Sequence, residues 1–196
     1  MSFLLCCYGG SVAQAAAGPL DSIESPLISG NFPLEGGIEV ETGDAQSQAI
    51  PGCSQVKTFQ LSGAGNRGEV IVALCEGGKF GPNNIDATLG KWVADSRESF
   101  KTMPPHVALF MLAGADPLPV VLEGGRQGKA MTLPAVGHGF ALIPLAYAVM
   151  PKGDATVVVQ AYLDPNNPRV LTEPIAVLLQ GIYKRLQQKK DGGRSH

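Results

Sequence analysis

The sequence is short of charge and of aromatic residues. Only 16% of its 196 residues are charged, against roughly 25% in an ordinary soluble domain, and 6% are aromatic. Basic residues are not in excess, since 15 Lys and Arg face 17 Asp and Glu and the net charge is −2. A nucleic-acid partner would call for a basic surface, and single strands or sugars would call for stacking aromatics. We therefore expect no nucleic-acid partner and no stacking platform.

Long hydrophobic runs and common catalytic motifs are also missing. The longest apolar stretch, residues 140–150, is about half of the ~20 residues that a membrane helix needs, so no transmembrane span is expected in the mature chain. No Gly-x-Ser-x-Gly elbow and no Gly-Lys-Ser/Thr phosphate loop occurs. The glycines Gly63, Gly65 and Gly68 lead into a predicted strand, which offers no helix N-terminus to a pyrophosphate. The sequence thus predicts no cofactor.

Metal ligands are scarce. Apart from His196, the chain has two histidines, His106 and His138, and neither has a second ligand at helical or strand spacing, so no metal site is predicted. His138 lies in a glycine-flanked loop before the most apolar segment and is the better functional candidate of the two. A joint site with a carboxylate such as Asp116 or Glu123 stays open, because spatial neighbours are invisible in a sequence.

The N-terminal segment resembles an export signal. Residues 1–17 carry no charge and contain the apolar run 3–8, and Ala13-Gln14-Ala15 is an A-x-A pattern that predicts cleavage after Ala15. The basic residues that usually precede such a run are missing, so a disordered apolar N-terminus is the alternative. We expect a signal peptide over residues 1–15 and a periplasmic or extracellular location.

The rest of the chain divides into a leader, one domain and a tail. Residues 16–50 are rich in Gly, Pro and acidic residues and are interpreted as an extended leader, which either lies across the domain or stays mobile. Within it, residues 37–42 alternate like a short strand. Residues 51–188 suit a single domain. Residues 189–196 form a basic tail whose end resembles a purification-tag remnant.

The two cysteines of the expected mature chain, Cys53 and Cys75, flank a predicted β-hairpin. Its β-rich runs, 55–61 and 69–74, are joined by a segment of turn-forming residues. If the turn is centred near Ala64, the numbers of opposed residues sum to about 128, as do 53 and 75. In an oxidising compartment this register favours a Cys53–Cys75 disulfide over two buried thiols.

Two amphipathic helices accompany further β-rich runs. One is predicted at about 84–101, with Trp92 as a core anchor rather than a ligand platform. The other is predicted at about 172–188, and the basic residues at its end suit the negative end of the helix dipole, with an anionic membrane as the alternative partner. The expected strands are 107–112, 120–123, 127–133, 140–150 and 156–163.

The last two strands decide the predicted fold class. They are nearly apolar throughout and are joined by a turn at residues 151–154, with Pro144 expected at a bulge or at the start of its strand. Strands without a polar face have to be covered on both sides. The sequence therefore predicts an α+β fold, an antiparallel β-sheet covered on both faces in an α/β/α sandwich, with the helices 84–101 and 172–188.

The order of these elements resembles the PsbP-like fold. A hairpin, an amphipathic helix, several strands, the long hairpin 140–163 with its Met150-Pro151-Lys152-Gly153 turn and a terminal helix follow one another over residues 54–186. That family includes extrinsic photosystem II subunits and small exported bacterial proteins. The resemblance rests on element order and carries over no functional residue. It implies a small exported binding or assembly domain.

Loops rich in Gly and Pro contain the remaining binding candidates. These are Asp116, Arg126, Lys129 and His138, which lie in such loops or directly beside them. We expect a non-catalytic exported domain that binds another protein of the cell envelope. The alternative is a small hydrolase or metal-dependent enzyme with His138 in its site.

Overall fold

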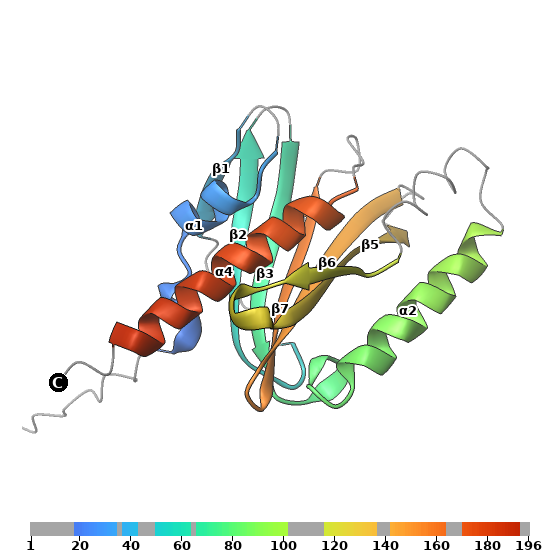
Figure 1. Ribbon diagram of the computed structural model, residues 1–196. Coiled ribbons are helices and arrows are strands. Elements are labelled where there is room, and N and C mark those ends of the chain that lie inside the picture. Colours follow the sequence, from blue (N-terminus) through green and yellow to red (C-terminus); the bar gives the residue numbers. More distant parts are fainter. Residues whose placement is uncertain are drawn as a thin grey trace, which may run out of the picture.

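The centre of the protein is one antiparallel sheet with the strand order β1-β2-β3-β7-β6-β5-β4 (Figure 1). The computed structural model describes residues 18–34, 37–42, 50–63, 66–101, 116–136, 142–163 and 170–192. The strands are β1 (Glu39–Thr42), β2 (Cys53–Gly63), β3 (Asn66–Cys75), β4 (Leu118–Val121), β5 (Gln127–Val136), β6 (Leu142–Lys152) and β7 (Ala155–Leu163).

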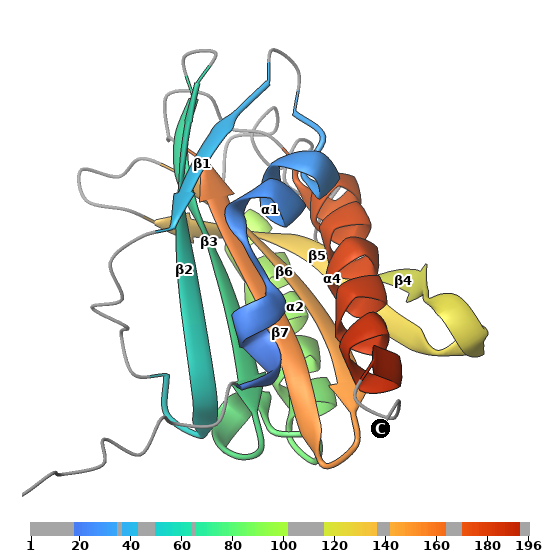
Figure 2. The ribbon, with the colours of Figure 1, turned by 90° about the vertical axis from the view of Figure 1, so that its left-hand side faces the viewer.

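Helices lie on both faces of this sheet. One face carries α4 (Thr172–Gly192), α1 (Ser25–Asn31) and the 3₁₀ turn η1 (Pro19–Ser22), and the other carries α2 (Ile85–Phe100), as Figure 2 shows from the side. A hydrophobic core fills the space on each side, and the larger one lies under α4. The predicted α+β class, with helices on both faces of an antiparallel sheet, is confirmed, although α2 covers only part of its face.

The two predicted helices occur close to their expected bounds. The peptide carbonyl of Asn84 accepts the N–H of Thr88 (2.9 Å) and starts α2, and Ile85, Leu89 and Val93 bury its apolar face. α4 continues four residues beyond the predicted end at 188. The ring of Trp92 packs against Phe80 and Tyr147, with centroid distances of 5.8 Å and 4.8 Å, in the manner of a core anchor.

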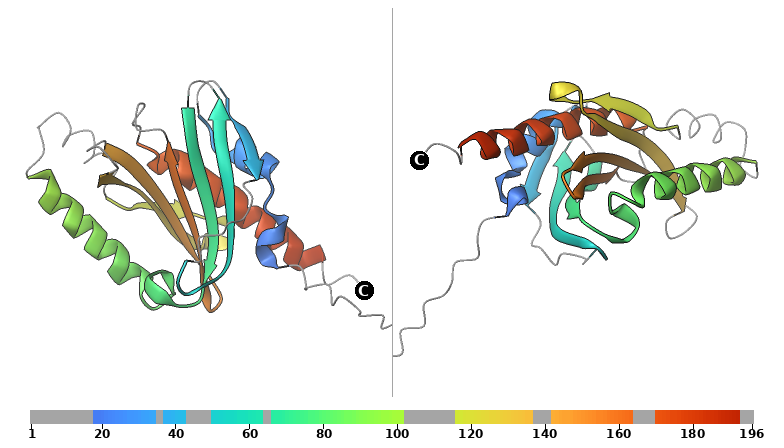
Figure 3. Two further views of the ribbon diagram at one scale, coloured as in Figure 1. Left: turned by 180° about the vertical axis from the view of Figure 1, so that it is seen from behind. Right: turned by 60° about the horizontal axis from the view of Figure 1, so that its bottom comes forward.

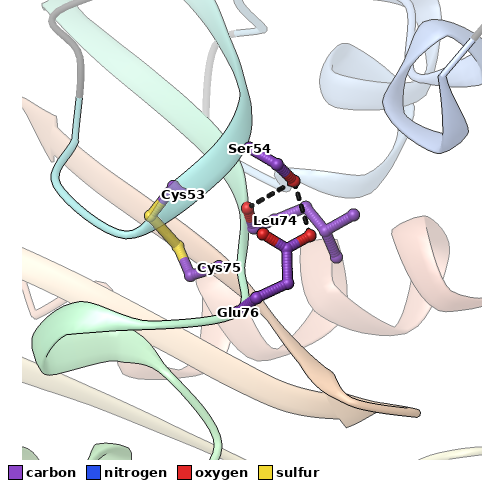
Figure 4. Close-up of a disulfide and its surroundings, with 5 residues drawn as sticks. All are labelled: Cys53, Ser54, Leu74, Cys75 and Glu76. Carbon is purple, nitrogen blue, oxygen red and sulfur yellow. Dashed lines mark hydrogen bonds between the residues drawn. A yellow bond between two sulfur atoms is a disulfide. The ribbon is translucent and has the colours of Figure 1, made fainter.

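The β2–β3 hairpin is closed by the disulfide Cys53–Cys75, with an S–S distance of 2.01 Å (Figure 4). The predicted pairing is confirmed, although the expected register was wrong by one residue. From Gln55↔Leu74 to the turn, the numbers of paired residues sum to 129. A β-bulge between Cys53 and Gln55 shifts the register back, so that the two cysteines oppose each other.

Part of the expected leader belongs to the core of the domain. Leu20, Ile23, Ile28 and Phe32 are at most 2% exposed, and they pack with the sheet and α4. β1 adds to the sheet beside β2, as residues 37–42 predicted. The described residues of the expected leader therefore lie across the domain instead of staying mobile. The packed domain begins well before residue 51.

The long hairpin has the predicted turn and a continuous register. Lys152 pairs with Ala155, and Gly153 in the turn between them has a φ of 61°, which favours glycine. Pro144 lies opposite Pro134 near the start of β6, just before β7 begins to pair at Leu145, so it lies at the strand's start and not at a bulge. β4 and β5 correspond to the predicted runs 120–123 and 127–133.

Several expectations fall on residues outside the described ranges. The signal segment 1–15, the strand 107–112, His106 and His138 are among them. Within the described ranges, no helix has both the length and the apolar character needed to cross a bilayer.

The disulfide is expected to contribute strongly to stability. Changing Cys53→Ala and Cys75→Ala together should lower the free energy of unfolding by about 3 kcal/mol, because the bridge restricts the unfolded chain. Urea unfolding of both proteins measures the difference. As a control, a reductant should weaken the wild type to the level of the double variant and leave that variant unchanged. Equal stability of the two oxidised samples would contradict the expectation.

Candidate functional site

A cleft of about 200 Å³ lies between the first turn of α2 and the ends of β5, β6 and β7. Ile85 and Val149 are buried apolar residues of its wall, and Asp86 and Lys129 are exposed at its mouth. Thr156, on β7, is one of its buried residues. We call this feature the α2 cleft.

The start of α2 is held over the sheet by a glycine-rich joint at the disulfide. The N–H groups of Glu76 and Gly77 donate to the carbonyl of Gly52 (both 3.0 Å). Gly52 has a φ of 85°, and a Cβ there would lie 2.4 Å from the carbonyl of Gly77, so only glycine fits. The side-chain amide of Asn84 donates to the carbonyl of Gly78 (2.8 Å). The disulfide, the glycine-rich joint and the start of α2 are therefore connected by consecutive hydrogen bonds, which hold the N-terminus of α2 over the sheet.

An ion pair joins the two sides of the cleft mouth. The ammonium of Lys129, on β5, lies 2.7 Å from a carboxylate oxygen of Asp86, in the first turn of α2. Both side chains are largely exposed, at 46% and 76%, so the pair contributes little to stability. The mouth thus presents one positive and one negative group side by side. Lys129 is one of the binding residues predicted from the sequence.

Thr156 carries a buried hydroxyl without a hydrogen-bond partner among the described residues. Its side chain is 2% exposed, and it lies in one cross-strand row with Cys75 and Pro151, on the α2 face of the sheet. Thr132, equally buried on β5, differs: its hydroxyl lies 2.9 Å from that of Thr172 and accepts the N–H of Leu171 (3.0 Å). A buried hydroxyl without a hydrogen bond lowers the stability of the folded state. The hydroxyl of Thr156 is in this situation among the described residues, and that of Thr132 is not.

A second surface lies on the same face, nearer the other end of the strands. α2 contacts mainly β5 and η2 (Gly78–Phe80), and in the left view of Figure 3 it stands apart from β2 and β3, with β6 and β7 between them. Two cross-strand rows there are half-buried or exposed, whereas the row between them on the opposite face, Phe59-Val70-Ala161-Ala146, is fully buried. We call this surface the open face; its rows are Thr58-Ile71-Gln160-Tyr147 and Gln60-Glu69-Tyr162-Leu145.

Two tyrosines give the open face hydrogen-bond donors. Burial raises the pKa of Tyr147, and burial together with the nearby carboxylate of Glu69 raises the pKa of Tyr162. Both phenols therefore stay protonated at neutral pH. Gln60 donates its amide to Glu69 (2.8 Å) and holds that carboxylate in place. The face combines apolar area with fixed polar groups and has little charge.

The structure does not gather the predicted binding residues into one site. Asp116 pairs with Arg97 in the last turn of α2, whereas Lys129 pairs with Asp86 in its first turn, so the two lie at opposite ends of that helix. Arg126 is exposed at the turn between β4 and β5, and the region of His138 is not described. Among the described residues, no group of three or more His, Cys, Asp or Glu is arranged to hold a metal ion.

Sequence reasoning missed both Thr156 and the open face. A signal for the open face exists, because Gln160 and Tyr162 are polar or amphipathic residues at alternate positions of a mostly apolar strand. Nothing in the sequence marks the hydroxyl of Thr156 as unpartnered, since the Thr132–Thr172 contact that distinguishes it depends on the tertiary fold.

Comparisons of the chain with protein-family models, with curated proteins and with solved structures find no match. Function is therefore inferred from the geometry of the α2 cleft and the open face.

The two buried threonines provide a matched test of the unpartnered hydroxyl. Thr132→Val should lower the free energy of unfolding by about 1 to 3 kcal/mol, because it leaves the buried N–H of Leu171 without an acceptor. Thr156→Val removes no hydrogen bond between described residues and should leave stability unchanged or slightly higher. Urea unfolding of both variants measures the contrast. Equal destabilisation by the two substitutions would show that the hydroxyl of Thr156 already has a partner.

Proposed function

We propose that this chain is a non-catalytic exported domain that binds another protein of the cell envelope through the open face. The observation that carries the proposal is the incomplete burial of two adjacent rows of side chains on the sheet, of which Gln60 is exposed and the others are half-buried. Inner strands are normally covered on both faces, and the equivalent positions on the α4 face, such as Val70, Val72 and Val159, are fully buried. A partner would complete the burial that α2 leaves unfinished.

The chemistry of the open face suits a protein partner. Tyr147, Tyr162, Leu145 and Ile71 offer aromatic and aliphatic area, and the amides and phenols beside them offer hydrogen bonds. Such a mixture, poor in charge and containing tyrosine, is typical of the centre of protein interfaces. Four strands span about 15 Å at a spacing of about 4.8 Å, which is wide enough for the central part of an interface.

The sheet edges are less suited to binding a partner by strand addition. On β4, Pro119 has no N–H, and the carbonyl of Val121 accepts the side-chain amide of Gln180 (3.3 Å). On β1, Glu39 and Glu41 place exposed carboxylates along the edge. Proline, charge and a capping helix are common devices against edge-to-edge pairing. These features favour binding at the open face over binding at an edge.

The proposed location has one structural support. A disulfide between Cys53 and Cys75 is compatible with an oxidising compartment, since cytosolic disulfides are uncommon. Membership of the PsbP-like family and the signal peptide remain predictions from the sequence. The hydrolase alternative also remains one, because His138 lies outside the described residues and no other observation favours it.

A photo-cross-linking residue at position 160 tests the proposed interface. In an envelope fraction it should form an adduct with one protein, because Gln160 lies in the middle of the open face. The same residue at position 177 should form none, because Val177 lies on α4, on the opposite side of the sheet, and is 40% exposed.

The captured protein is then purified, and its affinity is measured. Tyr162→Ala should weaken binding by at least about tenfold, whereas Val177→Ser should leave it unchanged. Thermal unfolding verifies that both variants are folded. Equal cross-linking at the two positions, or an affinity that is indifferent to Tyr162→Ala in a folded protein, would contradict the proposal.

A further inference from the structure

The disulfide belongs to the core that supports α2. Cys75 is fully buried, in the same hydrophobic cluster as the apolar face of α2, which consists of Ile85, Leu89 and Val93. Cys53 is half-buried and packs against this cluster. The bridge therefore closes the hairpin at the place where α2 packs on the sheet.

Two sets of hydrogen bonds depend on the position of the bridged strand ends. The carbonyl of Gly52 accepts the N–H groups of Glu76 and Gly77, both at 3.0 Å. The hydroxyl of Ser54 donates to the carboxylate of Glu76 (2.6 Å), and Figure 4 shows this contact beside the bridge. All four residues lie within two positions of a cysteine in the chain. The disulfide therefore fixes the separation across which these bonds form.

The segment after this joint is bonded directly to α2. The N–H of Ile85 donates to the carbonyl of Gly81 (2.9 Å), and the hydroxyl of Thr88 donates to the carbonyl of Lys79 (2.7 Å). Together with the bond from Asn84 to Gly78, these contacts tie the first turns of α2 to residues 78–81. A shift at the hairpin end is therefore transmitted to the start of the helix.

α2 in turn reaches the open face through the one tryptophan of the chain. Trp92 packs against Tyr147 with a centroid distance of 4.8 Å, and Tyr147 pairs with Gln160 in one row of the open face. On its other side, Trp92 lies 5.8 Å from the ring of Phe80. Displacement of α2 would change the surroundings of Trp92 and of Tyr147 at the same time.

Reduction of the bridge needs space beside a fully buried residue. Two thiol sulfurs cannot approach as closely as two bonded sulfurs, because non-bonded atoms repel each other at short range. β3 is held on its far side, where Cys75 pairs with Thr156 of β7. Cys53, by contrast, is the first residue of β2 and lies before a bulge, and β1 pairs with β2 only from Phe59 onward. The start of β2 and the joint at Gly52 are therefore the parts that yield.

We propose that the Cys53–Cys75 disulfide is a redox-sensitive latch that holds α2 on the sheet and thereby controls the open face. The control of the open face rests on the proposed function, whereas the latch itself does not. When the bridge is reduced, the start of α2 detaches and Tyr147 loses the support of Trp92. The partner then binds more weakly, because a surface held in its binding conformation binds more tightly.

The reductant of this latch is a dithiol. One of its thiolates attacks the sulfur of Cys53, the less buried of the two cysteines, and the S–S bond breaks with Cys75 as the leaving thiolate. The second thiol of the reductant then displaces Cys53 from the mixed disulfide. The two protons of the dithiol end on the two cysteines, and the reductant is left as a disulfide.

The fluorescence of Trp92 tests the latch in the full chain. After addition of dithiothreitol, its emission should move to longer wavelength, and its quenching by acrylamide should rise at least about twofold, because the ring leaves its buried contacts. The amide chemical shifts of Leu178 and Leu179, which are fully buried on α4, should stay unchanged and verify that the protein is folded.

The variant with both Cys53→Ala and Cys75→Ala is the control for the reductant. It should show the released emission of Trp92 without dithiothreitol, and dithiothreitol should not change it further. Since this variant keeps Cys6 and Cys7, an effect of the reductant through those residues would be detected in it.

Two glycine variants test the path from the bridge to α2. Gly52→Ala should shift the emission of Trp92 in the same direction with the disulfide intact, because a Cβ there would lie 2.4 Å from the carbonyl of Gly77. Gly124→Ala is the matched control. Gly124 also has a positive φ, of 75° against 85°, but a Cβ there would meet nothing within 4 Å, and the emission should not change.

The affinity of the protein captured at position 160 tests the control of the open face. Oxidised wild type and the double cysteine variant are compared without reductant, so that the partner's own cysteines are not affected. The double variant should bind at least about tenfold more weakly. Equal affinities would overturn the control of the open face and leave the protein interface intact.

Two results would overturn the latch. The first is an unchanged emission of Trp92 in a protein whose reduction is verified by alkylation of both thiols. The second is loss of the native shifts of α4 together with those of α2, since the disulfide would then support the whole fold and not α2 in particular. Absence of an adduct at position 160 would count against the proposed function alone, because the measurements on Trp92 need no partner.

Discussion

The pairing of β3 with β7 is the constraint on which the rest of the structure depends. Every other strand pair joins strands that are consecutive in the chain, so the sheet consists of two meanders, β1-β2-β3 and β4-β5-β6-β7, united by this one ladder. It runs through eight residue pairs, from Gly68↔Leu163 to Cys75↔Thr156. A Cβ at position 68 would lie 2.1 Å from the carbonyl oxygen of Tyr162, so the glycine at this position allows β3 and β7 to approach each other closely.

This pairing explains why the two faces of the sheet differ. α4 follows β7 and packs on one face, and the N-terminal segment returns to the same face, where Arg185 donates to the carbonyl of Ser22 (3.2 Å). Segments from both ends of the chain thus share one layer (Figure 2). The other face has α2, which is tethered at its start by the glycine joint. The α2 cleft and the open face are consequences of this unequal covering.

Local pattern and register predicted much of the fold. The helical spacing of Ile85, Leu89 and Val93 located α2, and the turn at Gly153 located the long hairpin. The disulfide was predicted from the position of the two cysteines relative to the hairpin. The predicted register is one residue off along most of the hairpin, and the bulge at Ser54 restores it at the cysteines. These features depend on residues that are near one another in the chain, so they can be predicted from a single sequence.

The remaining features depend on distant contacts. Ile23, Ile28 and Phe32 have no periodic spacing in a segment rich in glycine and proline, and their burial arises only because α4 passes over them. The ladder between β3 and β7 likewise has no local signal, and neither has the lack of a hydrogen-bond partner for Thr156 among the described residues. Among the described binding candidates Lys129 alone lines the α2 cleft, and its partner Asp86 lies 43 positions away in the sequence.

The central claim is that this is an exported, disulfide-closed binding domain, and the state of the chain in its own cells tests that claim most directly. The protein is isolated with its free thiols trapped by alkylation and is analysed by mass spectrometry without reduction. The account predicts a chain that begins at Ala16, with the peptides of Cys53 and Cys75 joined. A chain that retains its first residues and carries alkyl groups on both cysteines would contradict it.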